Sequence, residues 1–468
     1  MDSANKLKQL SQEVVQEPQE ASPACDLEMQ EQTQETGAGF FSSKWFVLSI
    51  SCLVSFLLFY TYDNPSATLV PARVYLAGTG PLGVDSMFSV MYSATTLPTI
   101  FLLPFIGRYL DDHGLHKIFP VCIVLLCLSQ SVVSLGIQLK IEYLAIAGRA
   151  VYGVVFETAS IICAAFVSNW MGARVALGMS MLNIFKRLGS CATAYLSLFV
   201  GTHFSIPFAF WMSAIFWAAS LFPCVRVGML ENKRRKRVQT EEQNLSEQVN
   251  LTLIQKIKLF NPLFWCLCLN YAFVSGIMLG FNTISSAFLT EAICNGDCCP
   301  AGIVTCTEQA DAETKASFLM SIPFITQMCV VSFFGMLVDR IGKRGILMQI
   351  GFALILVAFG LLMLPSLNIK ICALVIDGLG LAMVQSSVVP SFSRISTEAN
   401  VSTTFAVAYS LQSLVLTILP LCISALFRAY GTYNATIPFL GGLAACCCFS
   451  TIFLNILDFR ADRILHKR

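Results

Sequence analysis

Long apolar stretches recur from residue 45 to the end of the chain, and they limit its fold more than any other feature. Each stretch is about 20 residues long, which as a helix crosses a hydrocarbon layer of about 30 Å. Backbone groups in lipid must be hydrogen-bonded within the chain, so only helices or a closed barrel can span a membrane. The stretches show no strand-like alternation, and we therefore expect an all-α polytopic membrane protein.

The apolar stretches fall into two groups of six, separated by a polar segment with five consecutive basic residues. The twelve predicted spans cover residues 45–62, 86–107, 117–139, 142–168, 175–200, 206–226, 258–289, 317–338, 345–366, 369–393, 403–427 and 433–458. The corresponding domains are a disordered cytosolic tail (1–42), an N-terminal six-helix bundle (43–226), a basic and then Glu- and Gln-rich cytosolic linker (227–256), a C-terminal six-helix bundle (257–460) and a cytosolic tail (461–468).

Charged residues make up only 12% of the chain and apolar residues 56%. A soluble protein has about 25% charged residues, so lipid must cover much of this surface. The composition excludes a cytosolic enzyme, a nucleic-acid-binding protein and a secreted disulfide scaffold. The sequence shows no Ser, His and Asp cluster, no metal-ligand pair on one helix and no phosphate-binding loop. We expect no catalysis, no metal, no cofactor and no nucleic-acid partner.

Lys and Arg in the short connections indicate the orientation of the spans, because such loops stay on the cytosolic side. If the N-terminus is cytosolic, the cytosolic connections carry the basic run at 233–237 and many single basic residues, whereas the opposite side carries few. The cytosolic set is Arg108, Lys117, Arg174, Arg340, Lys343, Arg344, Arg394, Arg460 and Arg463, against Arg73, Lys140, Lys315, Lys370 and Arg428 on the other side. We expect both termini to be cytosolic.

Four of the 19 cysteines lie in a polar connection between two predicted spans, within residues 290–316. They are Cys294, Cys298, Cys299 and Cys306. The predicted orientation places this connection on the oxidising side, where cysteines form disulfides. A zinc site is the alternative, but no histidine is near and the spacing matches no common zinc finger. We expect at least one disulfide here.

One loop motif occurs twice, after the second and after the eighth predicted span. Both copies read Gly-x-x-x-Asp-x-x-Gly followed by basic residues, and the second begins 228 residues after the first (107 to 335). This spacing indicates an internal six-helix duplication. Glycine permits a close approach of helices, and the aspartate can accept backbone hydrogen bonds at a neighbouring helix N-terminus. The motif residues are Gly107, Asp111, Gly114 and Lys117 in the first copy and Gly335, Asp339, Arg340, Gly342 and Lys343 in the second.

The duplicated motif resembles the signature loop of the major facilitator superfamily, whose members are alternating-access carriers. The resemblance implies twelve helices in two six-helix pseudo-repeats, with the motif residues controlling a cytosolic gate. The second copy matches the family motif almost fully. The first copy differs, because Asp112 stands where the family usually has Arg and only Lys117 remains of the basic pair.

Four further stretches of the chain are distinctive. They are Tyr62-Asp63-Asn64-Pro65, Gly148-Arg149 with Gly153 and Glu157, Arg187-Leu188-Gly189-Ser190, and residues 460–467. These stretches resemble one branch of this family, the lysosomal dipeptide transporters. The resemblance implies export of dipeptides from a lysosome-like lumen to the cytosol, location in a lysosomal or vacuolar membrane, and a glycosylated lumenal accessory subunit. The cysteine-rich connection departs from that branch.

Few charges lie inside the predicted spans, and charges at this depth are costly enough to indicate function. Glu157 in the fourth span and Arg187 in the fifth both lie near the bilayer midplane, at a rise of about 1.5 Å per residue. We expect Arg187 to bind a substrate carboxylate and Glu157 its ammonium group; alternatively, the two neutralise each other in the empty carrier. Lys186 is rotated about 100° from Arg187, toward another helix or the interface. Arg149 and Asp377 are expected to serve coupling or structure.

Together these features favour an alternating-access carrier of small zwitterionic or cationic solutes, in particular dipeptides. The alternatives within transport are a carrier of amino acids, organic anions or a vitamin. From another class, a transport-inactive membrane scaffold or sensor is the alternative. Opposite charges kept at mid-membrane argue against a scaffold, since it has no need for them.

Inserted glycosylation acceptor sites test the predicted topology. Tags near residues 70, 300 and 430 should be modified, because these connections are predicted to be lumenal, whereas a tag near residue 240 should stay unmodified. A glycosidase-sensitive gel shift measures the modification. A modified tag near residue 240 would reverse the orientation.

Overall fold

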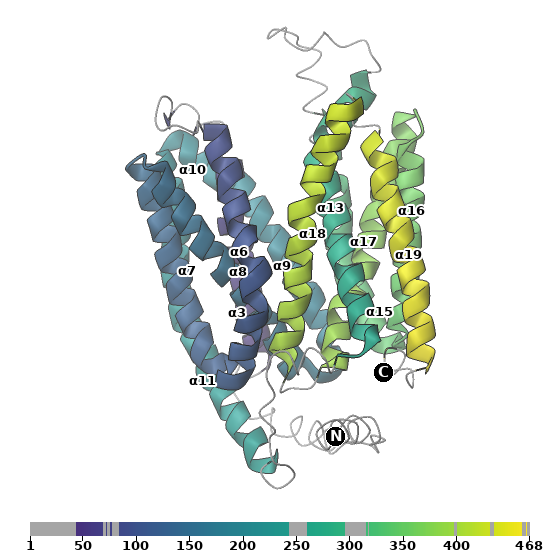
Figure 1. Ribbon diagram of the computed structural model, residues 1–468. Helices are drawn as coiled ribbons and strands as arrows, with labels where there is room; N and C mark the ends of the chain where they lie inside the picture. Colours follow the sequence, from purple (N-terminus) through teal and green to yellow (C-terminus); the bar gives the residue numbers. More distant parts are fainter. Residues whose placement is uncertain are drawn as a thin grey trace, which may run out of the picture.

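The computed structural model describes residues 44–68, 72, 75–76, 84–242, 260–294, 315–316, 318–396, 400–430, 435–460 and 465. Within these residues every regular element is helical (Figure 1). The N-terminal half contains α3 (Lys44–Tyr62), α4 (Asn64–Ala67), α6 (Val84–His113), α7 (Leu115–Gln138), α8 (Glu142–Met171), α9 (Val175–Ala192), α10 (Leu198–His203) and α11 (Ile206–Glu242). The C-terminal half contains α13 (Pro262–Cys294), α15 (Ile322–Ile341), α16 (Arg344–Leu362), α17 (Leu367–Ile395), α18 (Val401–Tyr430) and α19 (Thr436–Arg460).

The described helices cross the membrane twelve times. Eleven stretches are long and apolar enough to do so, and one of them, Glu142–Gly201, is 60 residues long. That stretch contains both α8 and α9, which are separated by a turn of 3-10 helix at Gly172–Arg174. A π-helical segment, Thr193–Ser197, joins α9 to α10 within the same crossing. The predicted all-α polytopic fold with twelve spans is therefore confirmed.

The helix ends differ from the predicted span ends, most clearly in α11. The sequence predicts that the sixth span ends at residue 226, but α11 continues to Glu242 through the first part of the predicted linker. The end of an apolar stretch shows where a helix leaves the lipid, but the helix itself can continue in water. Lys and Arg are good helix formers in water, so the basic run extends the helix.

The two halves pack as similar bundles and meet along two equivalent helix pairs. In the N-terminal half α7 packs against α8 and α11, and in the C-terminal half α16 packs against α17 and α19. Between the halves, the extensive contacts are α6 with α18 and α15 with α9. The repeat of 228 residues brings α6 onto α15 and α9 onto α18, so the two contacts are copies of one another (Figure 1).

The end of the chain is anchored to the C-terminal half. Leu465 is fully buried, and its backbone N–H donates to Asp458 Oδ1 at 2.8 Å. The Leu465 carbonyl accepts the backbone N–H of Arg344 at 3.1 Å, at the start of α16. Asp458 is itself fully buried. Leu465 is therefore held beside the second motif loop.

Replacing Asp458 should lower the stability of the C-terminal half. Asp458→Ala removes the acceptor of the buried Leu465 amide, and an unsatisfied buried donor costs about 1–3 kcal/mol. We expect the midpoint of thermal unfolding to fall by roughly 2–10 °C, measured in detergent by fluorescence-detected size exclusion. Asp458→Asn keeps an acceptor oxygen and is the matched control. An unchanged midpoint for the alanine variant would contradict the anchoring role.

Candidate functional site

Asp339, near the end of α15, caps the first turn of α9 in the other half. Its carboxylate accepts the backbone N–H groups of Ala176 (3.1 Å) and Leu177 (2.9 Å). The first N–H groups of a helix lack intrahelical partners and lie at the positive end of the helix dipole. Arg344, which is 2% exposed, lies 3.9 Å from the same carboxylate. Asp339 thus links the two halves through a charge-assisted cap.

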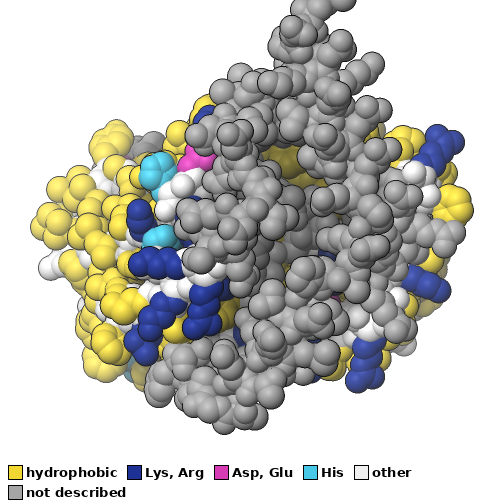
Figure 2. All heavy atoms as spheres, turned by 90° about the horizontal axis from the view of Figure 1, so that it is seen from below, with side chains coloured by type: hydrophobic (Ala, Val, Ile, Leu, Met, Phe, Trp, Pro, Cys, Tyr) yellow, Lys and Arg dark blue, Asp and Glu magenta, His cyan; other side chains and the backbone are white. Residues whose placement is uncertain are grey.

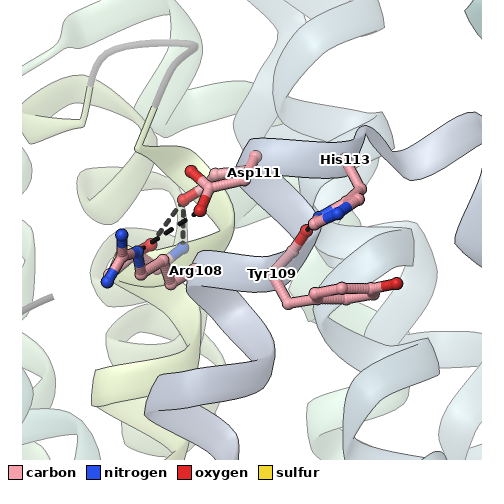
Figure 3. Close-up of polar contacts among 6 residues, drawn as sticks. Arg108, Tyr109, Asp111 and His113 are labelled. Carbon is pink, nitrogen blue, oxygen red and sulfur yellow. Dashed lines mark hydrogen bonds and ion pairs between the residues drawn. The ribbon is translucent and has the colours of Figure 1, made fainter. Parts of the chain in front are cut away.

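Asp111 makes the corresponding cap from α6 to α18. Its carboxylate accepts the backbone N–H groups of Ser402 (3.0 Å) and Thr403 (2.8 Å), and also the Thr403 hydroxyl. Figure 3 shows Asp111 reaching toward the start of α18, while Tyr109 and His113 of α6 point to the other side. The hydrogen bonds that the sequence predicts for the two aspartates are both present.

The motif glycines place these aspartates by letting the helices approach closely. A Cβ on Gly107 would collide with Ala406 and with the Ser402 backbone of α18, and a Cβ on Gly335 would collide with Ser180 of α9. Gly114 and Gly342 adopt positive φ angles of 88° and 70°. Such backbone favours glycine, because L side chains rarely adopt it.

The two copies of the motif differ in their basic residues. In the second copy Arg344 is buried beside Asp339, whereas Arg340 and Lys343 are exposed. In the first copy Asp112 is exposed and forms an ion pair with Arg108 at 3.3 Å. Lys117 is exposed as well. Both aspartates therefore accept two backbone amides. Asp111 has a hydroxyl as its further partner, whereas Asp339 has a nearby guanidinium.

Glu157 and Arg187 both lie at mid-depth and are half-buried. Glu157 is about 21 Å along α8 from its end at Met171, and Arg187 is about 18 Å along α9 from Val175. No ion pair within 4.0 Å joins them in the described part of the chain. The depth of both residues is as predicted, but they do not neutralise each other directly.

Arg187 reaches across to the C-terminal half. Its Nη2 donates to Met278 Sδ of α13 at 2.8 Å, and its guanidinium lies 4.8 Å from the Phe324 ring centroid of α15. Gln385 of α17 also donates to Met278 Sδ, at 3.5 Å, and accepts a hydrogen bond of 2.7 Å from Gln327. The result is a polar cluster on three helices of the other half.

The charges at this depth are arranged as two loose pairs. Glu157 interacts electrostatically with Lys186, whose ammonium lies 5.7 Å from the Phe59 ring centroid. Arg187 interacts electrostatically with Asp63, at the start of α4. The sequence predicts that Lys186 points toward another helix or the interface, and its ammonium lies over the Phe59 ring of α3. Asp63 was named only within a family stretch and was missed as a site residue. The signal for Asp63 was present, because it is a charge beside an apolar span.

An aromatic cluster lies between these charges and the gate. Tyr271 of α13 and Tyr409 of α18 stack with ring centroids 5.6 Å apart. Tyr271 lies about 14 Å from the start of α13, and Tyr409 lies about 12 Å from the start of α18. Both distances are shorter than the roughly 18 Å that separates Arg187 from the start of α9. The other rings of the cluster are Phe264, Phe392 and Phe405. This cluster makes the end near the gate apolar.

Arg149 and Asp377 are almost fully buried, on α8 and α17. Arg149 is 1% exposed and donates to the Thr61 carbonyl at 3.0 Å, while its Nε and Nη1 have no hydrogen-bond partner. Its guanidinium lies 5.2 Å from the Tyr152 ring centroid. Asp377 of α17 is 4% exposed, and no ion pair within 4.0 Å forms with it in the described residues. Asp377 is not part of the cluster around Arg187, whereas Arg149 interacts electrostatically with Asp63, the acidic partner of Arg187.

Two further expectations concern metals and disulfides. Among the residues that the structure describes, no group of three or more His, Cys, Asp or Glu side chains is arranged to hold a metal ion. The disulfide prediction for Cys294, Cys298, Cys299 and Cys306 falls on side chains outside the described residues.

Two six-helix bundles, joined by a duplicated aspartate cap and with charges at mid-depth, are typical of a membrane carrier. The family model of the Major Facilitator Superfamily matches residues 45–293 and 300–463. The chain belongs to this family of transporters. The predicted family is therefore confirmed.

Individual members of known families are similar to this chain in sequence or in structure. The human lysosomal dipeptide transporter MFSD1 is 22% identical over 426 residues, which cover 88% of this chain and 85% of that protein. The mouse MFSD1 is 22% identical over 400 residues, covering 82% and 80%. The structure of the human organic anion transporter MFSD10 (TETRAN) superposes with a TM-score of 0.62 at 16% identity, covering 87% of this chain and 99% of that one. A bacterial homologue of the iron transporter ferroportin, in an outward-facing state, gives 0.64 at 13% identity, with 88% and 98% covered.

Removing either cap should change conformational exchange more than substrate binding. Losing a charged N-cap costs about 1–2 kcal/mol, so Asp339→Ala or Asp111→Ala should shift the balance of gate states by about 5- to 30-fold. We expect slower transport with substrate-induced thermal stabilisation kept. Asp112→Ala is the matched control, because its ion pair with Arg108 is exposed and such pairs contribute little. Loss of substrate-induced stabilisation in a folded Asp339→Ala protein would count against a gating role.

Proposed function

We propose that this protein carries dipeptides, with Arg187 receiving the substrate carboxylate and Glu157 its amino terminus. The observation that supports this most is the environment of Arg187. Its hydrogen-bond acceptor among the described residues is the Met278 thioether, which is a weak acceptor. A guanidinium forms far stronger, bidentate hydrogen bonds with a carboxylate. Most of the hydrogen-bond donors of the Arg187 guanidinium therefore remain available to a substrate.

The separation of Glu157 from Arg187 also supports a substrate with two charged ends. The two side chains lie on different helices and are not in ion-pair contact. Lys186 is the cation coupled to Glu157 in the empty carrier. A substrate ammonium that approaches Glu157 would replace this interaction. Dipeptides and other zwitterions of similar length have the charges that such a site needs.

The glutamine pair beside Arg187 suits a peptide bond. Gln327 donates to Gln385, but the Gln327 Oε1 atom is buried without a hydrogen-bond partner. A buried acceptor without a partner costs free energy, and a substrate N–H group would satisfy it. These amides lie on α15 and α17, whereas the charges lie on α8 and α9. A bound peptide would therefore contact both halves of the carrier.

The direction and compartment are part of the same proposal. Export from a lysosome-like lumen to the cytosol, in a lysosomal or vacuolar membrane, is supported by the similarity to MFSD1 at 22% identity. A glycosylated lumenal accessory subunit is proposed on the resemblance alone. Co-localisation with lysosomal markers and purification with the bound partner are the direct tests.

An organic anion is the second candidate substrate, and the local charge balance favours it. Around the site, α3, α8, α9 and the adjoining α4 contribute Lys186, Arg187 and Arg149 against Glu157 and Asp63. The excess of one positive charge would suit a substrate with a carboxylate and no ammonium. Competition by N-acetylated dipeptides separates the two substrates, because they keep the carboxylate and lose the ammonium.

Uptake and binding by purified protein in proteoliposomes test the proposed site. Arg187→Ala or Glu157→Gln should weaken dipeptide binding by about 30-fold or more, because removing one partner of a desolvated charge pair costs roughly 2–5 kcal/mol. Esterified and N-acetylated dipeptides should fail to compete.

Lys186→Met is the comparison variant, since it removes the same charge from the residue before Arg187. Lys186 is the cation that a substrate ammonium would replace at Glu157, so this variant should bind dipeptides as well as wild type or more tightly, unlike Arg187→Ala. Normal dipeptide transport by a folded Arg187→Ala protein would reject the site. Effective competition by N-acetylated dipeptides would favour the organic anion.

A further inference from the structure

Helix α11 is much longer than a membrane span and continues on the side where α3 begins and α19 ends (Figure 1). Its 37 residues form a helix of about 55 Å, whereas the hydrocarbon core is about 30 Å thick. The excess projects beyond the other helices at the bottom of Figure 1. The projecting part carries the five consecutive basic residues Lys233, Arg234, Arg235, Lys236 and Arg237.

One face of α11 is exposed both within and beyond the membrane. Phe222 is 84% exposed and Met229 is 52% exposed. Arg226 and Lys233 are exposed as well. Successive spacings of four, three and four residues place these four side chains in one stripe along the helix. The opposite face, with Val227, is buried. The stripe therefore faces lipid, with an aromatic ring at membrane depth and cations at the headgroups.

The basic run at 233–237 and Lys117 together form a cationic surface. The turn between α6 and α7 makes up the side of this surface opposite the α11 extension. Gly114 adopts a φ of 88° there, and the Arg235 guanidinium occupies the space that a Cβ would need. Lys117 is exposed in the first turn of α7, where the helix dipole adds partial positive charge. The guanidinium of Arg235 thus connects the α11 extension to the turn.

Glu231 provides one acidic partner for these cations. Arg234 forms an ion pair with Glu231 at 3.2 Å, and Glu231 also accepts a hydrogen bond from Trp170. In the described part of the chain, no ion pair within 4.0 Å forms with Lys117, Lys233 or Arg235. Like charges this close repel one another, so the surface favours an anion. Figure 2, seen from below, shows Lys and Arg side chains gathered beside a hydrophobic flank on the left.

We propose that this cationic surface binds the multiply phosphorylated headgroup of an anionic lipid in the cytosolic leaflet. Clusters of four to eight basic residues immediately beside a transmembrane helix typically bind such lipids. The stripe favours a lipid over a soluble polyphosphate, because Phe222 and Met229 offer acyl chains a contact directly above the cations. The proposal is independent of the transported substrate.

The position of the surface links lipid binding to the gate. The α6–α7 turn follows Asp111 by three residues in sequence, and Asp111 caps α18. A lipid held by α11 and this turn fixes the cytosolic end of the N-terminal half in the leaflet. Asp111 and its partner helix α18 then lie on opposite sides of the boundary between the lipid-bound half and the C-terminal half.

Lipid retention by the full-length protein tests the proposal. The protein is placed in phosphatidylcholine nanodiscs that contain either a phosphatidylinositol bisphosphate or phosphatidylserine at equal total charge, and native mass spectrometry counts the lipids retained. The variant Lys233→Gln/Arg235→Gln/Arg237→Gln should bind the phosphoinositide about 100-fold more weakly, since each cation contributes roughly a factor of five. Wild-type protein should retain the phosphoinositide in preference to phosphatidylserine.

The control variant removes the same charge elsewhere on the same side of the protein. Arg174→Gln/Arg394→Gln/Arg460→Gln changes three exposed residues and should retain the phosphoinositide as wild type does. Equal loss in both variants would show nonspecific attraction and overturn the proposal. Displacement of the lipid by free inositol polyphosphate at equal concentration would also overturn it, since the site would then bind a soluble anion.

Discussion

The connection between the two halves depends on unpaired amide groups at the starts of two helices. The first turns of α9 and α18 present backbone N–H groups that no group in their own helices can satisfy. Asp339 and Asp111 each accept two of them from the opposite half. Because this interaction crosses the interface, the two halves close at this end, and the midpoint charges lie roughly 20 Å away along the helices.

Different kinds of side chain lie at different distances from the two aspartate caps. The aromatic cluster around Tyr271 and Tyr409 lies between the two aspartate caps and the charges at the level of Glu157 and Arg187. There the N-terminal half supplies the charges, and the C-terminal half supplies amides and a thioether. A substrate that needs both kinds of group must contact both halves, which couples its binding to their relative position.

The sequence predicts features that depend on depth better than features that depend on rotation about a helix axis. Apolar length and the duplicated motif lead to the twelve spans and to the capping role of the two aspartates. Glu157 and Arg187 lie at the predicted depth, but Arg187 contacts α13 and α15 instead of Glu157. Which neighbour a side chain meets depends on the tilt and rotation of packed helices, and a single sequence carries little of that information. The end of α11 was misplaced for a different reason, because a basic helix continues in water after its apolar span has ended.

The gate contacts have a consequence for sequence change over evolution. The donors at α9 and α18 are main-chain groups, so replacing Ala176, Leu177 or Ser402 by almost any other amino acid leaves the donor in place. Only proline would remove it, since proline has no backbone N–H. The acceptors, in contrast, are single side chains. The hydrogen bonds themselves therefore restrict the aspartate side of each contact more than the amide side.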